Sequence, residues 1–230
     1  MITSYWLRGM CGPSTATAAA VLLALAATIP AASAAPTRAE TSSCTVNGTP
    51  QSGPRIEGTG GDDRITCSFL APGHLVIDQL GNNVVELTGE VHGRVTTGFG
   101  RDAVFAAEGS RLFPQSSIRT SGGDDSVEIR GTTEGQILAG SGSDTIAFTS
   151  GATTTADTVV DAGGGDDSIR FDADVINLGR VDGGADDDRI TVPDNQGTVH
   201  GGGSGLEDDT DICEVGGNPP SGCEDPRAAR

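Results

Sequence analysis

Apolar and polar positions repeat along most of this chain with a fixed spacing. In each repeat an apolar residue lies seven positions before an Asp, and two more apolar residues follow that Asp at its second and fourth positions. The six clear copies begin at Ile56, Val95, Ile118, Ile137, Val160 and Val181. A weaker copy carries Asn83 in place of the Asp, and Asp211-x-Cys213-x-Val215 ends the series. Repetition at steps of 19 to 23 residues indicates a solenoid, whose repeats bury their apolar faces against one another.

Each repeat predicts two short β-strands. The first follows the Asp, and its apolar residues alternate with polar ones, as in Ser168-Ile169-Arg170-Phe171. The second surrounds the apolar residue that precedes the Asp, as in 180–182. The predicted fold is therefore all-β, a parallel solenoid of the β-roll or β-helix type over residues 56–215. It has two short strands in each coil of about 20 residues, and about seven to eight coils.

The two connections between these strands differ in their regularity. The one that leads to the Asp never changes length and is rich in glycine and acid, as in Gly163-Gly-Gly-Asp-Asp167. The one that leads away from the first strand varies, because the next apolar position lies 12 to 16 positions after the Asp. We therefore predict a uniform tight turn on one edge and variable loops on the other. Constant length on one edge is what a stacked row of ligand sites requires.

The tight turn resembles the nonapeptide of the RTX, or haemolysin-type, calcium-binding β-roll, whose pattern is GGxGxDxUx with U apolar. The nine-residue distance from Val95 to Val104 matches as well. The resemblance implies that Gly carbonyl groups and Asp carboxylates of stacked turns hold a row of Ca²⁺ ions. The candidate ligands that it implies are Gly61, Asp63, Gly98, Gly100, Asp102, Gly123, Asp125, Gly140, Gly142, Asp144, Gly163, Gly165, Asp167 and Asp188.

The sequence also departs from that family's pattern. RTX rolls carry the nonapeptide on both edges, whereas here it occupies one edge of a longer coil. Thr59 and Ser121 stand at the first Gly position in two copies, Asp186 stands at the second in another, and Asn83 replaces one Asp. The corresponding expectation is a single-edged row of ions in which some sites are missing.

Elementary electrostatics also favours a cation at this edge. Stacking places the repeated Asp residues about 4.8 Å apart. Two such charges repel by about 0.9 kcal/mol in water and by several times more when partly desolvated. Oxygen-rich turns of high charge suit a hard cation with six to eight ligands, which points to Ca²⁺ before Mg²⁺. The alternative is a metal-free solenoid, because Gly and Asp are also ordinary turn residues.

The N-terminus and the net charge indicate where the protein works. Residues 1–34 combine Arg8, an apolar run too short to span a bilayer and Ala32-Ser33-Ala34, which predicts a signal peptide and no membrane span after its cleavage. We expect a secreted, extracellular protein. The net charge of −18 and the lack of lysine argue against nucleic acid and anionic membranes as partners and favour cations. An extracellular protein or glycan partner stays unidentified.

Four cysteines follow the predicted signal peptide, two near each end of the repeats. Cys44 and Cys67 bracket the first repeat, and Cys213 and Cys223 bracket the last. This placement favours disulfides 44–67 and 213–223, which would tie down a cap segment (residues 35–55) and a C-terminal cap loop and tail (residues 216–230). The other two pairings and a zinc site stay open, although no CxxC-like spacing is present.

Three classes of function are compatible with the sequence. The leading hypothesis is a secreted calcium-binding repeat protein that serves as a structural or interaction module. The alternatives are a polysaccharide-acting β-helix enzyme and a metal-free solenoid used for adhesion. We expect no enzyme, because carboxylate pairs such as Asp166/Asp167 recur in most repeats, whereas catalysis needs one unique pair.

Overall fold

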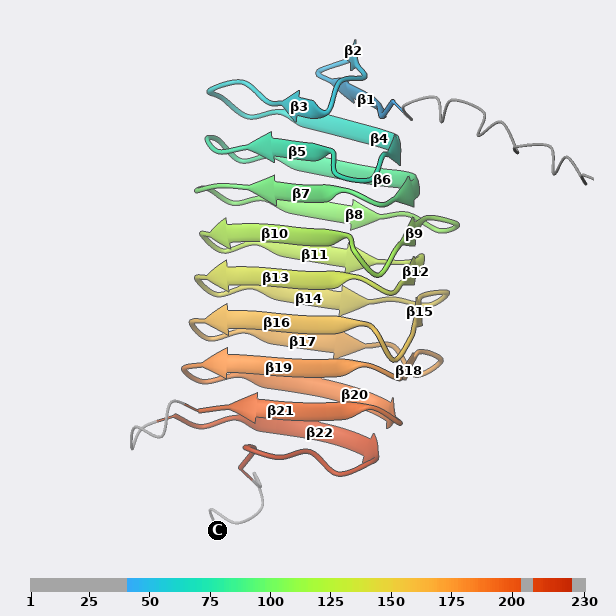
Figure 1. Cartoon of the computed structure of the whole chain (residues 1–230). Helices are drawn as coiled ribbons and strands as arrows, with labels where there is room; N and C mark the ends of the chain where they lie inside the picture. The colour runs from blue at the N-terminus through green and yellow to red at the C-terminus, as the bar shows by residue number, and fades with distance from the viewer. Residues whose placement is uncertain (1–40, 204–208, 225–230) are drawn as a thin grey trace, which may run out of the picture. The chain divides into compact units, whose positions relative to one another are not determined.

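The structure, a computed structural model, describes residues 41–203 and 209–224, and the predicted signal peptide lies outside these residues. The chain folds as an all-β parallel solenoid of about eight coils, as the repeat predicts (Figure 1). Two sheets form its walls. Each coil contributes one strand to the smaller sheet and one or two to the larger sheet, and a tight turn joins the two sheets at one edge.

The larger sheet contains fourteen strands and carries the segments that follow each Asp. Its strands are β1 (Ser43–Val46), β2 (Thr49–Gln51), β4 (Arg64–Leu70), β6 (Val84–Val91), β8 (Ala103–Ala106), β9 (Arg111–Leu112), β11 (Ser126–Ile129), β12 (Thr132–Thr133), β14 (Thr145–Phe148), β15 (Thr153–Thr154), β17 (Ser168–Phe171), β18 (Ile176–Asn177), β20 (Arg189–Asn195) and β22 (Ile212–Gly217).

The smaller sheet contains eight strands and carries the segments that precede each Asp. Its strands are β3 (Arg55–Glu57), β5 (Leu75–Asp78), β7 (Arg94–Thr97), β10 (Ser117–Gly122), β13 (Gln136–Ser141), β16 (Val159–Gly164), β19 (Arg180–Ala185) and β21 (Thr198–Gly202).

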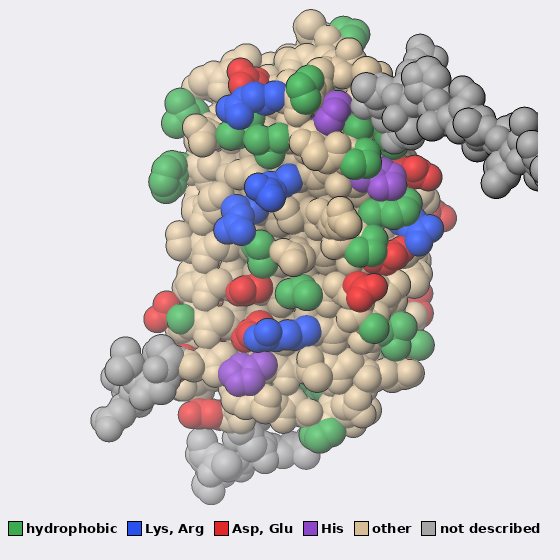
Figure 2. Space-filling view, viewed as in Figure 1, with side chains coloured by type: hydrophobic (Ala, Val, Ile, Leu, Met, Phe, Trp, Pro, Cys, Tyr) green, Lys and Arg blue, Asp and Glu red, His purple; other side chains and the backbone are tan. Residues whose placement is uncertain are grey.

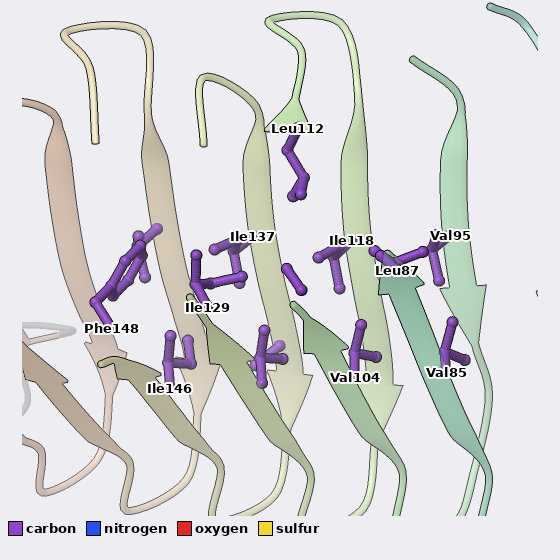
Figure 3. Close-up of a cluster of buried hydrophobic side chains, with 14 of the residues drawn as sticks. Val85, Leu87, Val95, Val104, Leu112, Ile118, Ile129, Ile137, Ile146 and Phe148 are labelled. Carbon is purple, nitrogen blue, oxygen red and sulfur yellow. The ribbon is translucent and has the colours of Figure 1, made fainter. Parts of the chain in front are cut away.

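The apolar positions of the repeat form the core because the coils stack in register. Ile118 of β10 pairs with Ile137 of β13, and Val127 of β11 pairs with Ile146 of β14. Alternation along each strand then directs these residues into the space between the sheets, where they are almost fully buried (Figure 3). Phe148 stacks on Phe171, the residue at the same position in the next coil, and their ring centroids are 4.2 Å apart.

The variable edge is more regular than the sequence indicated. We expected loops there, but β9, β12, β15 and β18 form short parallel strands in successive coils. Leu112 of β9, Thr133 of β12 and Thr154 of β15 occupy their inward positions and are buried. Two-residue strands are too short to show an alternation of apolar and polar residues, which is why the sequence did not reveal them.

Both ends of the stack are closed by a disulfide, as the cysteine positions favoured. Cys44 of β1 is bonded to Cys67 of β4, and Cys213 is bonded to Cys223. At the N-terminal end β1 runs antiparallel to β4 and covers the edge of the larger sheet. The Gln51 side chain donates from Nε2 to the Glu57 carbonyl and accepts the Glu57 N–H at Oε1. These two hydrogen bonds occupy the open edge of β3. Such protection keeps the terminal coils from pairing with other chains.

Candidate functional site

The repeated acidic position lies inside the solenoid, at the point where each tight turn enters the larger sheet. Its side chains are between 0% and 3% exposed. They form one column, here called the aspartate column, which contains Asp63, Asn83, Asp102, Asp125, Asp144, Asp167, Asp188 and Asp211. All the Asp residues that the sequence nominated as ligands belong to it. The charge of these residues is therefore held almost entirely away from water.

A ladder of hydrogen bonds joins successive members of the column. In each step the backbone N–H of one member donates to the Oδ1 atom of the member in the next coil, at 2.7 to 3.0 Å. The Asp125 N–H, for example, donates to Asp144 Oδ1 at 2.7 Å. This ladder gives the Asp residues a structural role that is independent of any ligand, because it satisfies backbone N–H groups that are buried in the turn.

Asn83 shows what the ladder itself requires. Its Oδ1 accepts the Asp63 N–H at 3.0 Å, just as an Asp does. Its Nδ2 donates to the turn carbonyl oxygens of Leu80 at 3.3 Å and Gly81 at 3.4 Å. An uncharged amide therefore completes the ladder and also satisfies the turn. The ladder does not need the negative charge that the other seven members carry.

In five of the Asp coils the second carboxylate oxygen, which corresponds to that amide nitrogen, has no partner. The Oδ2 atoms of five consecutive members are buried without a hydrogen-bond partner among the described residues: Asp102, Asp125, Asp144, Asp167 and Asp188. The turn carbonyls that correspond to Gly81 belong to Gly100, Gly123 and Gly142, and no described hydrogen bond uses them as acceptors. The turns of this part of the column thus hold two kinds of acceptor and no donor for either.

Burial shifts the pKa values of Asp125 and the column members that follow it upward. It raises the pKa of Asp125 and of Asp144 to about 6, that of Asp167 to about 7 and that of Asp188 to about 8. The ladder hydrogen bond opposes the shift in each case, and repulsion from neighbouring carboxylates adds to it. Near neutral pH the folded column therefore favours partners that neutralise its charge, which can be protons or a cation.

Asp63, at the N-terminal end of the column, is already satisfied by the protein. Its carboxylate accepts hydrogen bonds from the Asn47 side chain at 2.5 Å and from the Thr59 N–H at 2.5 Å. Burial alone would raise the pKa of Asp63, but these hydrogen bonds outweigh it and lower the pKa. Thr59 stands where the RTX pattern has its first Gly, so this departure supplies the donors that the other turns lack.

Asp78 is a buried acid that the sequence analysis missed. It is 2% exposed, and neither of its carboxylate oxygens has a hydrogen-bond partner among the described residues. Burial and the nearby charges of Asp63 and Asp102 raise its pKa to about 7. The corresponding positions of the other coils hold small residues: Gly58, Thr97, Thr120, Ala139, Ala162 and Gly183. The signal available in the sequence was an Asp at an inward-facing position where the other coils have small residues.

The glycines of the tight turn have a packing role. Gly123 has a φ of +123°, and a Cβ atom added there would lie 1.7 Å from the Gly100 carbonyl oxygen of the preceding coil. Gly142 and Gly165 meet the preceding turn in the same way. Stacked turns thus approach each other too closely for a side chain, which explains these glycines without a ligand. Gly61 differs, because the space around it is open and its φ is not left-handed.

Replacing Gly123 by alanine is therefore expected to destabilise the protein strongly, by about 3 kcal/mol or more, because backbone must move and φ is unfavourable. Gly164→Ala is the matched control. Gly164 lies in the same kind of turn but has open space around it and no left-handed φ, so alanine is expected to change stability by less than about 1 kcal/mol. Chemical unfolding of both variants measures the difference, and equal losses would refute the close packing of the turns.

No group of three or more His, Cys, Asp or Glu side chains within residues 41–203 and 209–224 is arranged to hold a metal ion. A cation in the aspartate column would therefore need backbone carbonyl ligands in addition to carboxylates. The first and second glycine positions differ in what they offer. The Gly98 carbonyl already accepts the Gly122 N–H at 3.1 Å, whereas the Gly100 carbonyl is not used in this way.

The fold and the column define a disulfide-closed parallel β-solenoid with a buried ladder of carboxylates. No family model matches the sequence, and neither the curated proteins nor the solved structures compared with it gave a significant match. The similarity to RTX repeats therefore rests on the turn motif alone. In the part of the chain that the structure describes, no helix is long and apolar enough to cross a membrane.

Proposed function

We propose that this protein is a secreted calcium-binding solenoid, a structural or interaction module whose aspartate column is neutralised by Ca²⁺ between stacked coils. The observation that carries the proposal is the contrast between Asn83 and the Asp members of the column. Both kinds of residue complete the ladder, but only the Asp residues bring buried charge and unpartnered oxygens. Buried charge that the fold does not need is expected where a ligand uses it.

The chemistry of the unused groups suits calcium. They are carboxylate and carbonyl oxygens, the ligands that hard cations prefer. The residues that would hold the ions are Asp102, Asp125, Asp144, Asp167 and Asp188, together with the carbonyl groups of Gly100, Gly123 and Gly142. Bound Ca²⁺ would supply positive charge to the column. Asp63 lies outside the proposed row because its carboxylate is already satisfied.

The proposed location outside the cell rests on two features of the chain. The N-terminal sequence has the pattern of a signal peptide, and two disulfides close the ends of the solenoid. Extracellular modules commonly bind Ca²⁺ with dissociation constants of about 10⁻⁴ to 10⁻³ M, which matches a site that fills only after export.

Calcium is expected to raise the melting temperature of the purified protein at pH 7.5. Removal of charge repulsion stabilises only the folded column, so the increase should grow with concentration as ligand linkage requires. Thermal unfolding followed by circular dichroism, in chelator and in up to about 5 mM CaCl₂, measures it. Mg²⁺ at the same concentration is the control for ionic strength and should have a smaller effect. Identical curves in chelator and in calcium would overturn the proposal and leave a solenoid whose ladder is neutralised by protons.

A further inference from the structure

A groove of about 610 Å³ lies beside the tight turns of the first coils. Its lining comes from β3, β5 and β7, from the turns that follow each of them, and from Ser121 of β10. The charged residues of the lining are Asp78 and the ion pair of Arg55 with Glu57. Ile77 and Thr96 take part in it from outward-facing positions, since their neighbours Val76 and Val95 point into the core. The groove therefore opens on the outer surface of the eight-stranded sheet, and its lining also includes Thr59 and Asp78, which lie beside Asp63 at the N-terminal end of the aspartate column.

Two large apolar side chains stand at this groove in contact with solvent. Leu80 is 56% exposed and Phe99 is 76% exposed, and both line the groove. Phe99 is the most exposed large hydrophobic residue of the described chain. It occupies a turn position at which the preceding coil has Leu80 and the other described coils have Gly, Ser or Ala, so the fold does not require an aromatic ring there. Hydrophobic side chains project at the turn edge of the upper coils in Figure 2.

Unpaired positive charge lies next to the same groove. Arg94 of β7 and Arg119 of β10 point outward from the eight-stranded sheet, and neither forms an ion pair with a described carboxylate. Arg119 is the register partner of Thr96, which lines the groove. By contrast, seven other described arginines pair with Asp or Glu. Free arginines are unexpected on a chain of net charge −18, and Figure 2 shows basic side chains over the upper half of this face.

We infer that this groove binds an acidic oligosaccharide, a chain of sugars that carry carboxylate groups. The apolar face of a sugar ring would lie on Phe99, and its hydroxyl groups would meet Thr96, Ser121 and Gln79 in the groove. Arg119 would pair with a carboxylate, for which its planar guanidinium is well suited. The lining carboxylate of Glu57 is paired with Arg55. One aromatic ring and several neutral polar groups in the groove, together with the unpaired Arg119 beside it, are therefore complementary to an acidic sugar chain.

An extended peptide is less well matched to the groove. Peptides that bind sheets commonly add a strand at a free edge. At this groove β5 lies between β3 and β7, and β7 lies between β5 and β10, so neither of them offers a free edge. The outer edge of β3 is occupied at Glu57 by the side chain of Gln51. Recognition must therefore come from side chains on the sheet surface, which favours a ligand with ring faces and hydroxyl groups.

The test is a calorimetric titration of the full protein with a tetramer of galacturonic acid, in chelator so that calcium does not bridge protein and sugar. The fully methyl-esterified tetramer is the matched neutral probe and should bind about tenfold more weakly, because it cannot pair with Arg119. Phe99→Ala and Arg119→Gln should each weaken binding of the acidic tetramer about tenfold. Leu178→Ala removes an apolar side chain that is 42% exposed elsewhere and should leave the affinity unchanged.

Melting temperatures establish that all three variants fold, since the changed side chains lie at the surface. Equal binding of the acidic and esterified tetramers would refute the role of the arginines. An unchanged affinity in Phe99→Ala would refute the groove as the site. Tighter binding of a glutamate tetramer than of the sugar would overturn the choice of ligand in favour of an acidic peptide. None of these outcomes bears on calcium, because the titration is carried out without it.

Discussion

Replacing Asp125, Asp144 and Asp167 together by asparagine is expected to stabilise the metal-free protein and to weaken its response to calcium. Asparagine keeps the Oδ1 acceptor of the ladder and removes three buried charges, as Asn83 already does in its own coil. If each substitution removes an unfavourable interaction equivalent to only one pKa unit, the free energy of unfolding at pH 8 increases by about 4 kcal/mol. That corresponds to an increase of roughly 10 °C in melting temperature in chelator.

Two controls separate this effect from other consequences of mutation. Asp124→Asn makes the same chemical change at an exposed position of the turn and should leave stability within about 0.5 kcal/mol. Asp144→Ala removes the acceptor of the Asp125 N–H and should destabilise the protein by about 1–3 kcal/mol. A triple asparagine variant that is less stable than the natural protein in chelator would contradict the account, since the charges would then be satisfied within the protein.

The metal-free protein is expected to lose stability as pH rises from about 4 to 8. An Asp has a pKa of about 3.8 when unfolded, and burial raises the values of four column members to between about 6 and about 8. Between these limits the folded state binds more protons than the unfolded state, so the free energy of unfolding falls as pH increases. If each of the four residues contributes one pKa unit, the free energy of unfolding falls by about 5 kcal/mol over this range.

Chemical unfolding in chelator at several pH values measures this profile. Repulsion among the surface acids acts in the same direction, so the triple asparagine variant is the necessary comparison. Its profile should be flatter between pH 5 and 8, because three of the titrating groups are absent. Parallel profiles for the two proteins would assign the pH dependence to the surface and contradict the raised pKa values.

The architecture could be predicted from the sequence because a solenoid repeats one local pattern. The alternation around each Asp and the seven-residue spacing determine which residues face inward, and register then places Ile118 above Ile137 without further information. The same logic favoured the observed disulfide pairing over the other two, because Cys67 and Cys213 occupy inward positions at opposite ends. The short strands at β9 and β12 were missed because the pairing of neighbouring coils, not their own sequence, creates them.

The candidate site was predicted only in outline. The sequence located the acidic column, but burial of the carboxylates and the ladder through Oδ1 depend on the path of the turn in three dimensions. The sequence pattern also gives Asp63 and Asp144 the same role. In the structure, however, Asn47 and Thr59 donate hydrogen bonds to the Asp63 carboxylate only. Asp78 stands outside the repeated motif, so only the stacking of coils brings it beside the column.

The central claim is that calcium occupies the aspartate column, and direct measurement of bound metal tests it most simply. The natural protein and the triple asparagine variant are dialysed together against about 2 mM CaCl₂ at pH 7.5, and calcium per chain is determined by elemental analysis. The account predicts several ions bound to the natural protein and clearly fewer to the variant. Equal amounts in the two proteins, or none in the natural protein, would contradict it.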